Sequence, residues 1–491
     1  MKRPAGAATL LALCSACAGV RAPGVRPAAD AGPREVAAGC PPERAARGEA
    51  RLVFLGDSGY GTGSSEWGTP GQEAIAGLIN HLDLPPDLVF MLGDNVYWTG
   101  SEDLYKARFD DMYDPLIRQC KVHVALGNHD VKGCRAAGGE ETAGDCVEKL
   151  EAALAADRAA QYLRQGMTEE AAREKAEQAT PSKAEEVPSA QAFQAFRANC
   201  LPSDASAYKD QAAGQCHAPA ALRHAQFGFG AADAEGPVEE RRQRYYKVPW
   251  PVPRLPDPAT GAAEPSAASL VEVLVADSNT LHVQGGLLAG GATPGLLRED
   301  RLQMLWLRSA LAAPSARGGS QSRGPWKIVT MHHSPYTPRA CACKLFGHCF
   351  GGHDEDPGLQ GELREALTGA DAPDLFISAH NHIYARTHPL DAAGQPVLEG
   401  SGGLRYFVTG GGGGPLYAVD APDSRFASAL TMYHFLYLRL TATAAFFWAV
   451  DHNGQVRDSG CFERGSNVDR PLSRDFGYAD PLPSGCAPPQ G

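Results

Sequence analysis

Seven residues that could hold two metal ions side by side are spread over five short motifs in this chain. The motifs are GDSG at 56–59, GDNVY at 93–97, GNHD at 127–130, HH at 332–333 and HNH at 380–382. Two metal ions about 3.5–4 Å apart can neutralise a phosphoryl group and lower the pKa of a water molecule. Because hydrolysis of a phosphate ester needs both effects, the motifs predict a dinuclear metal centre with that chemistry.

The donor atoms of these motifs favour first-row transition metals. Asp57 and Asp94 offer carboxylates, and the glycine before each lets the chain turn sharply at a strand end. Asn128 offers a neutral oxygen, and the HH and HNH motifs offer imidazoles. This mixed set suits borderline first-row metals better than calcium, and magnesium alone is not expected. An isolated histidine, such as His123 or His434, is more often a structural residue of the core.

An apolar run of strand length precedes each motif. The runs are LVFL, DLVFML, KVHVAL, WKIVTM and DLFISA, and they lack the alternation that is typical of half-exposed strands. Helix-like segments such as QEAIAGLINHL and ELREALTGA lie between them. This order predicts an α/β fold in which the runs are inner strands. Side chains just past the carboxyl ends of such strands are expected to converge at one site.

Composition and charge narrow the range of partners. The chain has 491 residues, of which 43% are apolar, and this is enough for a large core and excludes a disordered protein. Its formal net charge of −12 repels phosphate backbones, so extended nucleic acid is not an expected partner. A small phosphorylated substrate needs only a local cation. The oligomeric state stays open.

The first residues are typical of an exported protein. Lys2 and Arg3 precede the apolar stretch AATLLALCSACAGV, so residues 1–22 are interpreted as an export signal. Cys17 follows LCSA, an imperfect match to a bacterial lipoprotein cleavage box, which leaves a lipid tether and ordinary cleavage both open. Residues 23–49 are interpreted as a flexible linker. No later run reaches the roughly 20 apolar residues of a membrane span, so we expect a protein of the periplasm or cell envelope, or a secreted one.

Cysteine usage fits an oxidising compartment, in which disulfides are the default. Thirteen cysteines less Cys14 and Cys17 leave eleven, an odd number, so at least one does not pair within the chain. The loop CACKLFGHCFGGHDEDP at 341–357 contains three of them. Its histidines, His348 and His353, are expected to be solvated, and a position in the phosphate pocket is the alternative. Cys341, Cys343, Cys349 and His353 could also hold a structural zinc ion, but disulfide bonding is favoured.

A catalytic domain is predicted at 50–465, with a helical insertion at about 135–240 and a C-terminal tail at 466–491. A solvated helical hairpin on the surface is the favoured interpretation of the insertion, and a lid over the metal site is the alternative. The glycine run at 410–414 follows the strand-like RYFVT and predicts a tight loop, or a close approach of the backbone to a bound phosphate.

The five motifs, in this order, resemble those of the calcineurin-like metallophosphoesterases, and in particular those of the purple acid phosphatases. Most members of the superfamily carry a histidine two residues after the first aspartate, where this chain has Gly59. Tyr97 supplies the replacement, since the corresponding tyrosine of purple acid phosphatases coordinates a ferric ion as phenolate. A trivalent cation stabilises a phenolate whose free pKa is about 10.

Similarity to the tartrate-resistant branch extends over about residues 50–462 through RYYKV, VLVADSNTL and QMLWLRSAL. It implies a four-layer αββα sandwich of the metallophosphoesterase type. The helical insertion, the Cys-rich loop and Ala379, which stands where the family has glycine, depart from the pattern. The first two leave the choice of substrate open.

The resemblance also implies a ligand set for each metal ion. The V-x-x-H spacing from Val329 and the downstream Tyr336 select His332 rather than His333 as a ligand. A ferric ion would be bound by Asp57, Tyr97 and His382, a divalent ion (iron, zinc or manganese) by Asn128, His332 and His380, and Asp94 would bridge the two.

His129 resembles the family's acid beside the metal centre, which steadies the phosphate or protonates the leaving alkoxide, with Asp130 orienting its ring. A metal-bound hydroxide would be the nucleophile, and no covalent phosphoenzyme is expected. The sequence thus predicts an exported phosphomonoesterase of the acid phosphatase type. The alternatives are a phosphodiesterase or nucleotide-hydrolysing metallophosphoesterase, and a non-catalytic metal-containing binding protein of the envelope.

Overall fold

Strand β1 (Glu49–Leu55) shows how the apolar runs contribute to two cores at once. Val53 and Leu55 pack into one hydrophobic cluster, and Leu52 and Phe54 pack into another. All four side chains are fully buried. Because successive side chains of a strand point to opposite faces, an apolar run without alternation is what a strand between two layers requires.

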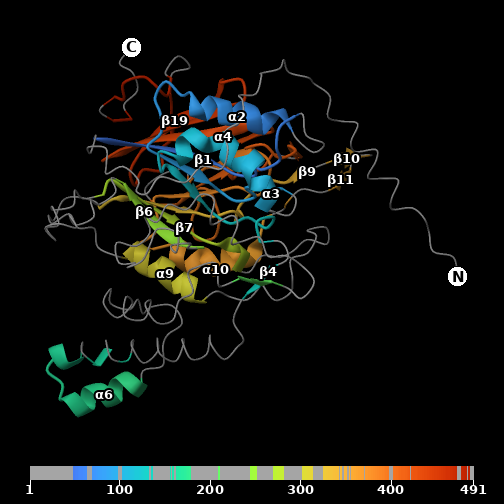
Figure 1. Ribbon diagram of the computed structural model, residues 1–491. Coiled ribbons are helices and arrows are strands. Elements are labelled where there is room, and N and C mark those ends of the chain that lie inside the picture. Colours follow the sequence, from blue (N-terminus) through green and yellow to red (C-terminus); the bar gives the residue numbers. More distant parts are fainter. Residues whose placement is uncertain are drawn as a thin grey trace, which may run out of the picture.

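The computed structural model is drawn as a ribbon in Figure 1. It describes residues 48–63, 69–97, 102–131, 134–136, 155, 158–159, 162–178, 208–210, 244–250, 269–280, 301–312, 324–341, 343–345, 348–350, 353, 355–369, 371–397, 402–420, 422–472, 477–483 and 485–486.

The first large sheet is mixed, with the strand order β20-β19-β18-β17-β1-β2-β3. Strands β1, β2 and β3 run parallel, whereas β17 pairs with β1 in antiparallel fashion and the strands beyond it continue antiparallel. Their bounds are Leu88–Met91 for β2, Val122–Val124 for β3, His434–Thr441 for β17, Ala444–Asp451 for β18, Val456–Glu463 for β19 and Arg470–Pro471 for β20.

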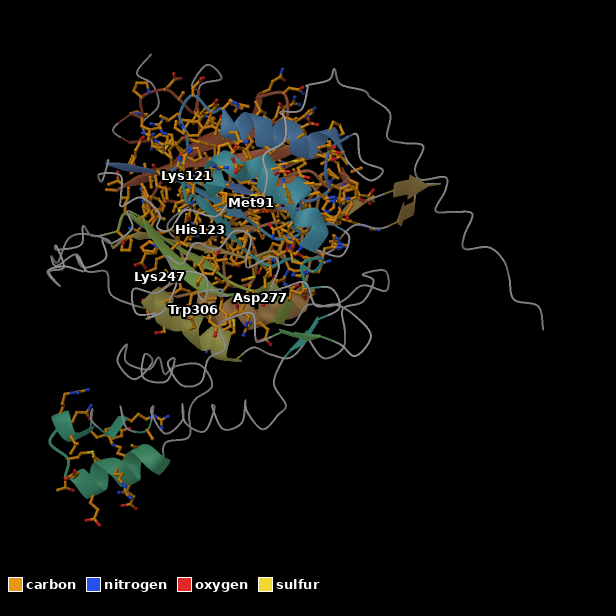
Figure 2. The ribbon with its side chains drawn as sticks, in the orientation of Figure 1. Met91, Lys121, His123, Lys247, Asp277 and Trp306 are labelled. Atoms are coloured by element: carbon orange, nitrogen blue, oxygen red, sulfur yellow. A yellow bond between two sulfur atoms is a disulfide. The ribbon has the colours of Figure 1, made fainter. Side chains whose placement is uncertain are left out.

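Strand β3 lies at the edge of this sheet, although the sequence predicts an inner strand. Its residues are nevertheless buried, because the second sheet covers them. The Tyr246 hydroxyl donates a hydrogen bond to the carbonyl of Val124 (2.8 Å). His123, labelled in Figure 2, stacks on Phe90, and burial lowers its pKa to about 3. It is a residue of the core, as predicted.

The second large sheet is also mixed, with the order β16-β13-β14-β12-β8-β7-β6. Strands β14, β12, β8 and β7 run parallel, and β16, β13 and β6 are antiparallel to their neighbours. Their bounds are Tyr246–Trp250 for β6, Val271–Val275 for β7, Trp326–Thr330 for β8, Leu375–Ser378 for β12, Tyr384–Thr387 for β13, Arg405–Thr409 for β14 and Phe426–Leu430 for β16.

The described residues also form small two-stranded sheets, separate from the large ones. They are β4 (Cys134–Ala136) with β5 (Tyr208–Asp210), β9 (Ala340–Cys341) with β15 (Ala418–Val419), and β10 (Cys343–Leu345) with β11 (His348–Phe350).

Helices cover the outer faces of both sheets (Figure 1). One hydrophobic cluster joins the first sheet to its helices, a second fills the space between the sheets, and a third joins the second sheet to its helices. This is the four-layer αββα arrangement predicted from the sequence. The helices are α2 (Pro70–Asn80), α3 (Glu102–Tyr105), the π-helix η2 (Lys106–Asp110) and α4 (Asp111–Ile117) on the first sheet, and α9 (Arg301–Ala312) and α10 (Pro357–Leu367) on the second; a single 3-10 turn, η5 (Ser278–Thr280), follows β7.

The predicted insertion is described only in part. Helix α6 (Glu169–Gln178) belongs to it and lies apart from the layers in Figure 1. Most of the range 135–240 lies outside the described residues, as do residues 1–47, so the hairpin, the export signal and the linker stay predictions. No described helix combines the length and the apolarity needed to cross a bilayer.

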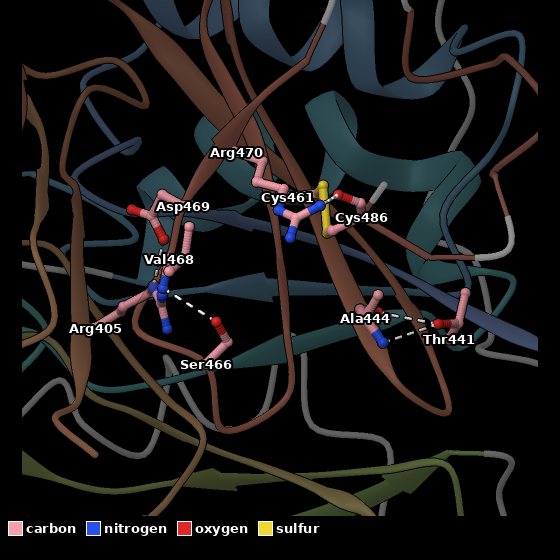
Figure 3. Close-up of a disulfide and its surroundings, with 9 residues drawn as sticks. All are labelled: Arg405, Thr441, Ala444, Cys461, Ser466, Val468, Asp469, Arg470 and Cys486. Atoms are coloured by element: carbon pink, nitrogen blue, oxygen red, sulfur yellow. Dashed lines mark hydrogen bonds and ion pairs between the residues drawn. A yellow bond between two sulfur atoms is a disulfide. The ribbon is translucent and has the colours of Figure 1, made fainter. Parts of the chain in front are cut away.

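The C-terminal tail is tied to the first sheet. Strand β20 pairs with β19, and Cys461 of β19 forms a disulfide with Cys486 (Figure 3). The guanidinium of Arg470 donates a hydrogen bond to the carbonyl of Cys486 (2.8 Å). Cys120 and Cys341 are disulfide-bonded as well, which agrees with the predicted oxidising chemistry and, for Cys341, with a disulfide rather than zinc.

We predict that His434 makes the protein less stable in acid. Its side chain is fully buried, and burial lowers its pKa to about 4, although a bond from its ring to the carbonyl of Met432 opposes this. The unfolded chain takes up a proton below about pH 6.5, so stability falls between pH 6.5 and 4 by up to about 1.4 kcal/mol per pH unit. The free energy of unfolding, measured with urea at several pH values in this range, should fall less steeply with decreasing pH for His434→Gln than for the wild type. His81→Gln, at an exposed position, should show the same pH dependence of stability as the wild type. The same pH dependence in both variants would contradict the prediction.

Candidate metal centre

The five motifs meet where the carboxyl ends of parallel strands from both sheets lie close together. Asp57 and Asp94 follow β1 and β2, and Asn128 follows β3, all in the first sheet. His332 and His380 follow β8 and β12 in the second sheet. Because the strands run parallel within each group, their motifs lie at the same sheet edge.

Three of the predicted ligands have left-handed backbones. The φ angles are 57° at Asp57, 51° at Asp94 and 68° at His380, and Cys120 is the other described non-glycine residue with a positive φ. Side chains with a Cβ rarely adopt this conformation, and such strain concentrates at functional sites. The hydrogen bond from the backbone N–H of His380 to Asp57 Oδ2 (2.8 Å) holds two of these turns against each other.

The first group of donors contains Tyr97, Asp57 and His382. The phenol oxygen of Tyr97 lies 3.0 Å from Asp57 Oδ1 and 2.9 Å from His382 Nε2. The other ring nitrogen of His382, Nδ1, donates to the carbonyl of Pro415 (2.7 Å), so in the neutral ring Nε2 carries the lone pair. A histidine whose outer nitrogen is bound to a carbonyl in this way is typical of metal ligands.

A cation is needed before Tyr97 can become a phenolate. Burial raises the pKa of Tyr97 well above its ordinary value, and the negative charges of Asp57 and Asp94 raise it further. Only a strong positive charge between these oxygen atoms could reverse that effect. The donor set therefore fits a highly charged metal ion at this position.

The second group contains Asn128, His332 and His380. His332 Nε2 lies 3.0 Å from Asn128 Oδ1 and 3.0 Å from His380 Nδ1. When His332 is neutral, as a metal ligand must be, its Nδ1 donates to the carbonyl of Leu92 (2.8 Å) and its Nε2 carries a lone pair that faces the amide oxygen of Asn128. Two lone pairs that face each other without a proton fit a cation between them.

Asp94 lies between the two groups. Its Oδ1 is 3.6 Å from His332 Nε2, and donor atoms of Asp57, Asp94 and His332 all lie within 4.8 Å of one another. Burial acts to raise the pKa of Asp94, but His332 and His129 lower it to about 2. The carboxylate is thus ionised and placed to contact both groups.

His333 is close to these donors but has a different partner. Its Nδ1 lies 2.7 Å from Ser278 Oγ, and this hydroxyl also accepts a hydrogen bond from the backbone N–H of His333 (3.0 Å). His332, His333 and His380 could together hold a metal ion, since their donor atoms lie within 4.8 Å. Ser278 was not predicted as a site residue, although its position just past β7 matches that of the motifs.

His129 and Asp130 occupy different positions in the site. The ring of His129 packs on that of Tyr97 (4.4 Å between centroids), and its Nε2 is 3.9 Å from Asp94 Oδ2. Asp130 accepts hydrogen bonds from the backbone N–H groups of Gly127 and Asn95 and from the side chain of Asn95. It thus links the second and third motifs, and its predicted effect on the His129 ring stays a prediction.

The glycine run at 410–414 packs against the loops that carry the ligands. A Cβ at Gly410 would lie 2.7 Å from Asp57 Oδ2, and one at Gly414 would lie 2.7 Å from His382 Cε1. The N–H of Gly414 donates to the carbonyl of Asp57 (2.7 Å). The predicted tight loop therefore packs directly against both Asp57 and His382.

Gly59 brings the first two motifs into contact. The N–H of Gly59 donates to the carbonyl of Asp94 (3.2 Å), and the N–H of Tyr97 donates to the carbonyl of Gly59 (2.9 Å). A Cβ at Gly59 would lie only 2.1 Å from the carbonyl oxygen of Asn95. The absence of a side chain at Gly59 is therefore what allows the chain to place Tyr97 beside Asp57.

His353 of the Cys-rich loop lies in the site, in line with the alternative to a solvated position. Its ring centroid is 3.7 Å from that of His380. The side chain of His348, the other histidine of this loop, lies outside what the structure describes.

Comparison with known proteins agrees with this geometry. Residues 50–165, which contain the first three motifs, match the family model of the calcineurin-like phosphoesterases. No curated protein matches the chain in sequence. The chain thus carries a calcineurin-like phosphoesterase domain, which supports the metallophosphoesterase hydrolase that its motifs predict.

Solved structures of several proteins are similar to the chain at low sequence identity. The purple acid phosphatase PPD1 from seeds of yellow lupin (Lupinus luteus) has 14% identity and a TM-score of 0.46, over 88% of this chain and 55% of the lupin chain. PhoD has 10% identity and a TM-score of 0.42, over 88% and 73%. GAP50, described as the anchor in the inner membrane complex of Plasmodium, has 11% identity and a TM-score of 0.41, over 89% and 99%. The chain thus spans about half the length of the lupin enzyme.

We predict that Gly59→Ala displaces Tyr97 and weakens metal binding at the first group of donors. The added Cβ must move the chain at Asn95, because the oxygen there is backbone. Metal analysis of the purified variant should show less than one equivalent at this site. Gly77→Ala in helix α2, where a Cβ meets nothing within 4 Å, is the matched control and should bind metal like the wild type. Full metal content in Gly59→Ala would contradict the prediction.

Proposed function

We propose that the protein is an exported phosphomonoesterase of the purple acid phosphatase type, with a ferric ion and a divalent ion (iron, zinc or manganese). The single observation that carries the proposal is the phenol oxygen of Tyr97 beside Asp57 and His382, with Gly59 leaving room for it. A tyrosine among carboxylate and imidazole donors suits a ferric ion, because phenolate needs a highly charged partner. The proposed ligands are Asp57, Tyr97 and His382 for the ferric ion, Asn128, His332 and His380 for the divalent ion, and Asp94 for both.

When bound, the two metal ions would neutralise the phosphoryl oxygens and lower the pKa of water. The protein's own contribution is to hold the donors rigidly before metal binds. His332 and His382 are each fixed by a hydrogen bond from Nδ1 to a backbone carbonyl. Preorganised ligands of this kind lose little freedom when the substrate arrives.

His129 is the residue we assign to proton transfer. Its side chain is 17% exposed, whereas that of Asp94 beside it is 2% exposed, so His129 borders the solvent side of the site. Its backbone N–H donates to Asp94 Oδ1 (2.8 Å), which fixes the residue next to both groups of donors. From there its ring can hydrogen-bond the phosphate and give a proton to the departing alkoxide.

Export is supported by the sequence of residues 1–22 and by the disulfides. Disulfides persist in oxidising compartments such as the periplasm and the cell exterior. The bond between Cys461 and Cys486 and the oxidised state of Cys120 and Cys341 fit such a compartment.

We predict that the iron-loaded protein absorbs visible light and that Tyr97→Phe loses this absorption. The band arises from charge transfer between the Tyr97 phenolate and ferric iron, and phenylalanine cannot form it. Far-UV circular dichroism of Tyr97→Phe should match the wild type. An iron-loaded wild type without the band, or a variant that keeps it, would contradict the ferric assignment.

We predict that His129→Asn keeps both metals but lowers kcat for phosphate monoesters by roughly 10²–10⁴-fold. The metals remain because their proposed donors are intact. A panel of monoesters, diesters and nucleotides measured with both proteins provides the readout. Preference for diesters would replace the monoesterase proposal with a phosphodiesterase, and an unchanged kcat would remove His129 from proton transfer.

A further inference from the structure

His380 lacks the hydrogen bond that fixes the other two histidines of the site. His332 and His382 each donate from Nδ1 to a backbone carbonyl. The Nδ1 of His380 faces His332 Nε2 (3.0 Å), and no partner of its other ring nitrogen is found among the described residues. Histidine ligands are normally oriented by such an outer partner. No described residue other than His332 thus hydrogen-bonds to a ring nitrogen of His380.

His353 packs on the face of His380. The ring centroids are 3.7 Å apart and the planes are inclined by 34°, which is closer than the contacts of His380 with His333 (4.3 Å) and His332 (4.9 Å). The ring of His353 also lies 5.7 Å from that of Tyr417. A ring at this distance restricts rotation of the His380 imidazole about its side-chain bonds.

Asn381, between the two histidines of the HNH motif, holds the loop that carries His353. Its buried amide nitrogen lies 2.6 Å from Thr337 Oγ1, 3.3 Å from the carbonyl of Pro338 and 3.3 Å from the carbonyl of His353. Thr337 and Pro338 precede the Cys-rich loop, and His353 stands near its end. One amide group thus contacts both sides of the loop.

Further contacts fix the chain at both ends of the loop. Strand β9 before it pairs with β15, and the carbonyl of Arg339 accepts a hydrogen bond from the N–H of Asp420 (3.0 Å). Near its end, Glu355 forms an ion pair with Arg425 (2.7 Å). The position of His353 is therefore determined by the framework around it.

We propose that His353 is a positioning residue that holds the His380 ring for the divalent ion, and that Asn381 positions His353 through the loop. The inference rests on the proposed function, because it takes His380 as a ligand. It assigns the Cys-rich loop a role in metal retention. A loop that only carried disulfides, or was only solvated, would not have this role.

The test measures Zn²⁺ affinity at the divalent site of the full-length protein with its ferric site loaded. Competition with a chelator gives the affinity, the zinc-to-iron ratio gives the occupancy, and visible absorption reports on the ferric site. His353→Ala should weaken Zn²⁺ binding by about 10-fold or more, because loss of an outer partner of a histidine ligand typically costs 10–100-fold. The visible band should not change.

Matched variants separate stacking from other roles. His353→Phe keeps a flat ring and should restore most of the affinity, and His81→Ala, at an exposed position, should leave it unchanged. Asn381→Ala should weaken binding, and the double variant with His353→Ala should be no weaker than the weaker single variant, because both act through one contact.

Two results would overturn the proposal. One is wild-type Zn²⁺ affinity in His353→Ala, including the case in which only KM for the substrate rises. The other is a His353→Phe variant as weak as His353→Ala. A wild type that takes up no second metal at all would instead refute the proposed function, and this is seen before any variant is made.

Discussion

The contact between Gly59 and Tyr97 is the constraint on which the rest of the site depends. The two backbone segments approach so closely that a single Cβ at Gly59 would overlap the carbonyl of Asn95. This approach places the phenol oxygen of Tyr97 within hydrogen-bond distance of Asp57 and His382. A histidine at position 59, as most of the superfamily has, would not fit here. The missing histidine and the added tyrosine are thus two consequences of one backbone arrangement.

The layered fold brings metal-binding side chains from both sheets together at one edge of the sandwich. Strands β1, β2 and β3 bring the carboxylates and Asn128, whereas β8 and β12 bring the imidazoles from the other sheet. The cluster between the sheets is apolar, so hydrophobic packing holds the two halves of the site together. The left-handed turns at Asp57, Asp94 and His380 are strained conformations that this packing can hold.

Much of this arrangement could be predicted from the sequence because it depends on local patterns. The unbroken apolar runs indicate strands between layers, and the glycines of GDSG and GDNVY indicate sharp turns after them. The edge position of β3 could not be predicted, since it is covered by Tyr246 from a distant strand. The place of Ser278 could not be predicted either, and that of His353 could be given only as an alternative, because each depends on a contact with a histidine of another motif.

The most direct test of the account is anomalous X-ray diffraction from crystals of the metal-loaded protein. We expect two peaks about 3.5–4 Å apart. One should lie about 2 Å from the phenol oxygen of Tyr97, the other about 2 Å from the amide oxygen of Asn128, and the Asp94 carboxylate should touch both. A single peak, or a Tyr97 oxygen out of reach of either metal, would contradict the account.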